Sequence, residues 1–170
     1  MPNGKAHASA TILLAAGLGF ISISLRDDTA LTTVAVVGGC LAGLVLTPDL
    51  DVDRGSISHR IVKHSAGFLI GFAWHLFWFP YSRIMPHRSW WSHMPFFSTC
   101  FRVAYLFALP AVFWLLANTV FVMPAFEIPT WSWLPTAFIG LMLADTLHAL
   151  MDITDSFVKR RVYRLTRIRW

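Results

Sequence analysis

The stretch FLIGFAWHLFWFPYSR, Phe68 to Arg83, decides the fold, because it determines whether the chain crosses a membrane four or five times. It is apolar, but His75 interrupts it and it contains two tryptophans and a tyrosine. A membrane-spanning helix needs about 20 predominantly apolar residues. Tryptophan and tyrosine gather at the membrane–water interface instead. We therefore expect residues 68–83 to lie in the interface rather than to cross the bilayer.

The chain as a whole is too apolar for a soluble domain, since 56% of its 170 residues are hydrophobic and 14% are charged. Short polar or proline-containing segments join its long apolar stretches into two helical hairpins. We predict one all-α integral membrane domain over residues 1–170, folded as a four-helix bundle with a Trp-rich interfacial segment between helices 2 and 3. The expected segments are spans at about 9–25, 31–46, 103–123 and 134–150, the interfacial segment at about 68–83, and a basic tail at 159–170.

The charge distribution supports four spans and sets their orientation. The chain has 14 Lys and Arg against 9 Asp and Glu, a net charge of +5. With four spans, only Arg26 lies on the face opposite the other basic residues, which the positive-inside rule places in the cytoplasm. We therefore expect cytoplasmic N- and C-termini. The excess charge also favours contact with the lipid bilayer, and no nucleic-acid-binding module is recognisable, so we expect no nucleic acid partner.

This topology brings four polar clusters to the same membrane face. His7 opens the first helix, and PDLDVD at 48–53 follows the second. HRSWWSH at 87–93 precedes the third helix, and ADTLHALMD at 144–152 ends the fourth. Polar side chains near a membrane are costly unless they are paired, solvated or bound to metal. The shared location therefore indicates one site rather than four unrelated patches.

The fourth cluster has the spacing of metal ligands. Asp145, His148 and Asp152 fall at i, i+3 and i+7, within roughly 60° of arc on a helix. Carboxylate oxygen and imidazole nitrogen together suit Zn, Mn or Fe. The alternative is a polar helix end beside the basic tail, but Asp145 lies inside the apolar run, where an unpaired carboxylate is expensive. The pattern predicts a divalent metal, Zn or Mn.

Two loops can add ligands. Asp49 and Asp51 alternate after the second helix, although a calcium loop is excluded because its glycine is one position late and Arg60 stands at the twelfth position. Solvated turn formation is the alternative for these aspartates. His87 and His93 are six residues apart, which favours one in the loop and one in the first turn of the next helix, or else an interfacial anchor.

The order and spacing of these motifs resemble a family of small metal-binding membrane proteins frequent in cyanobacterial genomes. The motifs are MPNGKAH at 1–7, TPDLD at 47–51, PHRSWWSH at 86–93 and DTLHALMD at 145–152, so the resemblance covers most of the chain. Less closely, the chain resembles YdjM-type inner-membrane metal-dependent hydrolases. The resemblance implies a bacterial inner or plasma membrane, or a thylakoid. It implies metal ligands at His7, Asp49, Asp51, His87, His93, Asp145, His148 and Asp152.

The resulting hypothesis is a metal-dependent hydrolase at the cytoplasmic face that acts on phosphate esters, phospholipid headgroups or another amphiphilic phosphate. Asp152, or whichever of Asp49 and Asp51 is not a ligand, would act as general base, and Arg88 would bind the phosphate. The alternative is a non-catalytic metal-binding subunit or assembly factor of a membrane protein complex. A catalytic site keeps a coordination position open, whereas a structural site is closed by protein ligands.

Overall fold

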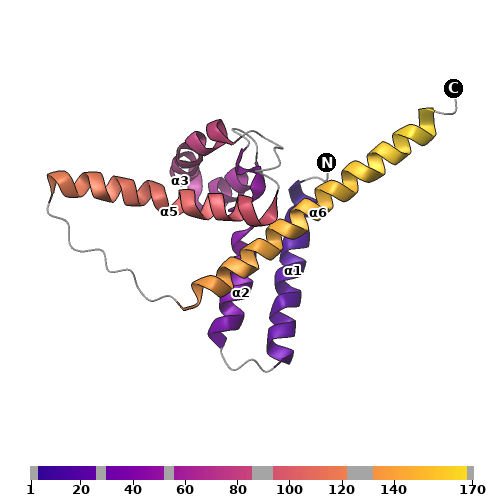
Figure 1. Ribbon diagram of the computed structural model, residues 1–170, viewed down its shortest axis with the longest axis horizontal. Coiled ribbons are helices and arrows are strands. Elements are labelled where there is room, and N and C mark those ends of the chain that lie inside the picture. The colour runs from indigo at the N-terminus through magenta and orange to yellow at the C-terminus, as the bar shows by residue number, and fades with distance from the viewer. Residues whose placement is uncertain (1–3, 26–29, 52–55, 86–93, 122–131, 168–170) are drawn as a thin grey trace.

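A computed structural model describes residues 4–25, 30–51, 56–85, 94–121 and 132–167 (Figure 1). The described residues form helices joined by short turns and contain no strand, which confirms the all-α prediction. The elements are α1 (Gly4–Ser24), α2 (Ala30–Ala42), the 3-10 helix η1 (Pro48–Asp51), α3 (Ile57–Ile84), α5 (Pro95–Val120) and α6 (Leu134–Arg167).

Three of these helices are long and apolar enough to cross a membrane: α1, α5 and the Leu134–Tyr163 part of α6. The fourth expected span corresponds to α2, a shorter apolar helix of 13 residues. Helix α6 continues past residue 150, where we expected the last span to end. Its sequence after Gly140 contains no glycine or proline, and Lys159 pairs with Asp155 one turn earlier at 2.7 Å, so nothing stops the helix there.

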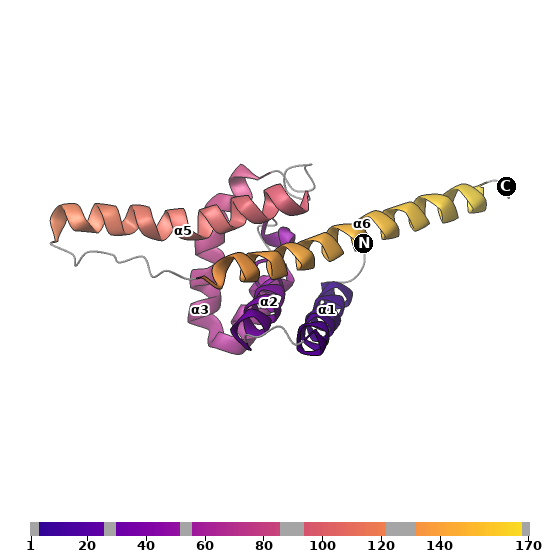
Figure 2. The ribbon, with the colours of Figure 1, turned by 60° about the horizontal axis from the view of Figure 1, so that its bottom comes forward.

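Helices α1 and α2 lie side by side as an antiparallel hairpin, and α6 packs against both (Figures 1 and 2). The centre of this contact consists of small buried side chains, Ala15, Cys40 and Ala144. Glycines bring α2 and α6 closer still. A Cβ atom added at Gly39 would lie 1.9 Å from the carbonyl oxygen of Ala137. The two backbones are therefore in direct contact, and no larger residue fits between them.

This close contact gives a stability prediction. We expect Gly39→Ala to force α2 and α6 apart and to lower the free energy of unfolding by about 1 to 3 kcal/mol, the usual cost of overpacking. The measurement is denaturant unfolding in detergent micelles, followed by circular dichroism. Gly38→Ala is the matched control, because a Cβ atom at Gly38 meets nothing within 4 Å. Equal stability of the two variants would show that α2 and α6 are not in backbone contact.

Helix α3 folds back on itself at Gly67, whose φ of +87° lies in the left-handed region that favours glycine. The Trp-rich segment forms the arm after this kink. Trp78 is 1% exposed and packs with Tyr81 against Leu50 of η1, whereas Phe68 on the same arm is 67% exposed. The segment therefore has an inward aromatic side that holds η1 in place, in addition to an outward apolar side.

The four apolar helices are not packed equally. Helix α5 meets α6 near Arg102, and the far end of α5 and the C-terminal end of α6 project from the remaining helices in opposite directions (Figures 1 and 2). The packed unit comprises α1, α2 and α6. The structure thus confirms an all-helical protein with helices apolar enough for a membrane, while a single four-helix bundle is not confirmed.

Candidate metal centre

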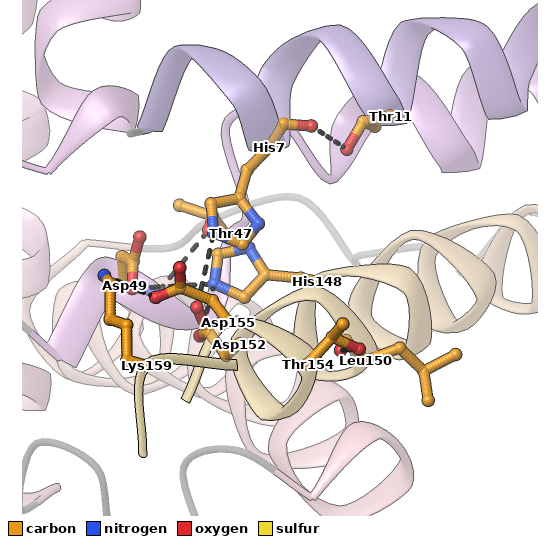
Figure 3. Close-up of polar contacts among 10 residues, drawn as sticks. All are labelled: His7, Thr11, Thr47, Asp49, His148, Leu150, Asp152, Thr154, Asp155 and Lys159. Atoms are coloured by element: carbon orange, nitrogen blue, oxygen red, sulfur yellow. Dashed lines mark hydrogen bonds and ion pairs between the residues drawn. The ribbon is translucent and has the colours of Figure 1, made fainter. Parts of the chain in front are cut away.

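The structure brings together His7, His148 and Asp152, three of the residues that the sequence identified. The first turn of α1 supplies His7, and α6 supplies the other two, which share a face because they are four residues apart. His7 Nε2 lies 3.3 Å from Asp152 Oδ1, and His148 Nε2 lies 3.4 Å from Asp152 Oδ2. The two imidazole rings stack with their centroids 4.0 Å apart (Figure 3). Both rings thus turn their Nε2 atoms toward one carboxylate.

The burial and the spacing of these donors fit a metal ion. His7 and His148 are 6% and 7% exposed, so both rings are held away from solvent, with their Nε2 atoms at the Asp152 carboxylate. Donor atoms arranged tetrahedrally at about 2.0 to 2.1 Å from an ion lie about 3.3 to 3.4 Å from one another. The His7, His148 and Asp152 donors, all within 4.8 Å of one another, can therefore hold a metal ion.

Asp49 places a second carboxylate beside this group. Its Oδ1 lies 3.7 Å from His148 Nε2, and its backbone N–H donates to Thr47 Oγ1 at 3.4 Å. Pro48, at the first position of η1, has the φ that suits a helix start and fixes the entry of this short turn. Burial raises the pKa of the Asp49 carboxyl, but the contact with the His148 ring outweighs burial, so the pKa lies below its ordinary value. Asp49 is therefore an anionic neighbour of the cluster.

Asp145 lies one turn before His148 but has different partners. Its carboxylate accepts hydrogen bonds from Arg102 and Thr99 of α5, and Arg102 Nη1 donates to Ser98 Oγ at 2.8 Å. Arg102 and Asp145 are 0% and 1% exposed. The charge of Asp145 is thus compensated by an arginine, and the structure does not bring Asp145 into the group of three that can hold an ion.

Sequence reasoning missed the role of Arg102, because the expected third span began at residue 103 and left Arg102 just outside it. Helix α5 begins at Pro95, so Arg102 lies in the second turn of that helix and not in a loop. A signal was present: Ser98 and Thr99 precede Arg102 by one turn inside an apolar sequence, so all three fall on one helix face. An arginine with two hydroxyls on its own face needs an acidic partner when it is buried.

The remaining predicted site residues are placed as follows. Asp51 is buried in η1 at 4% exposure, and it is not part of the group of three. His87, Arg88 and His93 lie outside the described residues. The candidate centre in the described part of the chain therefore consists of His7, His148 and Asp152, with Asp49 adjacent.

The fold and the site together define an all-helical protein with a group of two buried histidines and one half-buried aspartate suited to a divalent metal. The chain belongs to the family DUF2227, described as an uncharacterized metal-binding protein family, whose model matches residues 2–162. No curated protein and no solved structure matches the chain. The match includes every predicted ligand, and the family description agrees with the prediction of a metal-binding protein.

Proposed function

We propose that the protein is an integral membrane, metal-dependent hydrolase whose divalent ion, Zn or Mn, is held by His7, His148 and Asp152. The observation that carries the proposal is the convergence of two buried histidines and a half-buried aspartate from two apolar helices, with donor atoms that all lie within 4.8 Å of one another. A divalent ion between the two Nε2 atoms and the Asp152 carboxylate would replace the contacts that both rings make with Asp152, and its binding would stabilise the packing of α1 against α6.

The number of protein donors favours catalysis. Catalytic zinc sites have three protein ligands and keep a fourth position for water or substrate. A divalent ion bound here would acidify a water molecule and polarise a phosphoryl oxygen. Asp49, 3.7 Å from His148, is the nearby carboxylate that can accept the proton of such a water as general base. Asp152 therefore acts as a ligand in this scheme, and Arg88 keeps its predicted role of binding the phosphate.

The surroundings favour an amphiphilic phosphate as substrate. The centre lies where α1 begins and where α6 leaves its most apolar part, and four apolar helices, α1, α2, α5 and α6, form the membrane part of the proposed protein. The positive-inside rule favours the cytoplasmic side for the basic residues, and we therefore propose the cytoplasmic face of the membrane for both termini and for the centre. Phospholipid headgroups lie at this face of the membrane, and a phosphate ester can reach it from the cytoplasm.

The direct test is a hydrolysis assay of metal-loaded protein in nanodiscs, with a water-soluble phosphate ester and a phospholipid as substrates. We expect turnover that chelation abolishes and metal restores. We expect Asp49→Asn to lower turnover by about 10²- to 10⁴-fold, the usual contribution of a general base, while the metal content is unchanged. Metal-loaded wild type that turns over neither substrate contradicts the catalytic proposal.

The position of Asp49 also supports a second candidate, a non-catalytic metal-binding subunit of a membrane complex. At 3.7 Å from His148, the Asp49 carboxylate is close enough to become a fourth protein ligand and close the site. In that case Asp49→Asn lowers metal affinity, and no variant shows turnover. The same variant thus separates the two functions by whether it changes turnover or metal content.

A further inference from the structure

The C-terminal half of α6 extends beyond the packed helices (Figures 1 and 2). Every described residue from Ser156 to Tyr163 is exposed. The 34 residues of α6 form a helix about 51 Å long, whereas the hydrocarbon core of a bilayer is about 30 Å thick. If the first half of α6 crosses the bilayer, the second half must pass through the headgroup layer.

One side of this extension changes from apolar to basic along the helix. Leu150, Ile153 and Phe157 are 55%, 65% and 62% exposed and fall within about 60° of arc. Arg160 and Arg161, both exposed, lie within about 60° of Phe157 on the next turn. We name these five residues the outer face of α6. Apolar side chains followed by arginines on one line match the order of acyl chains and phosphates in a membrane leaflet.

The outer face is opposite to the metal centre. At 100° per residue, His148 projects about 180° from Phe157, and Asp152 about 140° from it. Lys159 projects about 160° from Phe157, and its ammonium pairs with Asp155 at 2.7 Å. The arginines of the outer face therefore form a positive surface separate from the centre and from the nearest lysine.

We propose that the outer face of α6 binds the headgroups of anionic phospholipids in the membrane that holds the protein. The charge is complementary, since the sequence after Asp155 contains six basic residues and no acidic one. Arginine binds phosphate with its forked donors, and the apolar residues on the same line favour a lipid over a nucleic acid. The proposal rests on insertion of the chain in a bilayer, and it does not depend on hydrolysis.

The test compares two variants that each remove one positive charge from the same part of the helix. Full-length protein is equilibrated with micelles that contain equal amounts of phosphatidylglycerol and phosphatidylcholine, and native mass spectrometry measures the ratio of the two bound lipids. We expect wild type to prefer phosphatidylglycerol. Arg161→Gln should lower this preference about fivefold, the effect of one basic residue near an anionic surface. Lys159→Gln should leave the preference unchanged within about twofold, because Lys159 projects about 160° from Phe157 and is not part of the outer face.

Three results would overturn the proposal: equal binding of the two lipids by wild type, equal losses in both variants, or displacement of phosphatidylglycerol by millimolar inorganic phosphate or a DNA duplex. The last result would assign the arginines to a soluble anion or a nucleic acid. A chain that purifies without detergent would refute bilayer insertion instead, and so would refute the proposed function as well. Circular dichroism confirms that each variant keeps its helical content.

Discussion

The double variant His7→Ala, His148→Ala is expected to lose divalent metal binding by more than about a hundredfold. Removal of a residue that only orients a ligand costs 10- to 100-fold in metal affinity, and this variant removes two ligands. The two rings stack at 4.0 Å and both direct Nε2 toward Asp152, so no other imidazole in the described residues can replace them. Competition titration against a chromophoric chelator, with Zn and then Mn, measures the change.

His64→Ala is the matched control for this prediction. His64 is an exposed imidazole on α3, outside the group that can hold an ion, so its removal should leave metal affinity unchanged. Circular dichroism in micelles checks that the double variant is folded. Unchanged affinity in a folded double variant would mean that the ion is bound elsewhere, and equal losses in the control and the double variant would mean that binding is non-specific.

Arg102→Met is expected to lower the free energy of unfolding by about 3 to 5 kcal/mol. The substitution leaves Asp145 with an uncompensated charge at 1% exposure, and removing one partner of a buried ion pair has a cost of this size. It also removes the Arg102 hydrogen bonds to Asp145 and Ser98, so Thr99 is left as the α5 residue that donates to Asp145 of α6. Denaturant unfolding in micelles measures the loss.

The double variant Arg102→Met, Asp145→Leu separates this explanation from a simple packing defect. Replacing both charged groups removes the uncompensated carboxylate, so stability should return to within about 1 to 2 kcal/mol of wild type. If the double variant is as unstable as Arg102→Met alone, the loss arises from the missing arginine side chain and not from the buried charge. Metal content of the refolded double variant further shows whether Asp145 contributes to the centre.

The apolar helices α1, α2, α5 and α6 could be predicted from the sequence. So could the location of His7 on the same side of the protein as the polar residues of α6. Apolar runs locate helices because each must bury or insert a long apolar surface, and topology then places their polar ends on one side. The i, i+4 spacing of His148 and Asp152 predicted correctly that they share a face. The stacking of His7 on His148 was not predictable, because it depends on how α1 packs against α6.

The roles of Asp145 and Arg102 were not predictable from helix periodicity. Asp145 has the register of a ligand, yet its partner comes from a helix 43 residues away in sequence. A membrane span chosen for maximum hydropathy begins after Arg102. Arg102 is then left out of the predicted helix, and its ion pair with Asp145 is not foreseen. The course of α3 was missed for a similar reason, since Gly67 reverses the chain within a stretch that is helical on both sides. Tertiary contacts, rather than local pattern, decided these features.

The central claim is that His7 and His148 bind the same divalent ion, and X-ray absorption spectroscopy of metal-loaded wild type tests it most directly. We predict a first shell of nitrogen and oxygen at about 2.0 to 2.2 Å, with multiple scattering from two imidazoles for each ion. The spectrum of Asp152→Asn should keep the imidazole signal, because both rings are unchanged. A first shell of oxygen alone, or one containing sulfur from Cys40 or Cys100, would contradict the centre described here.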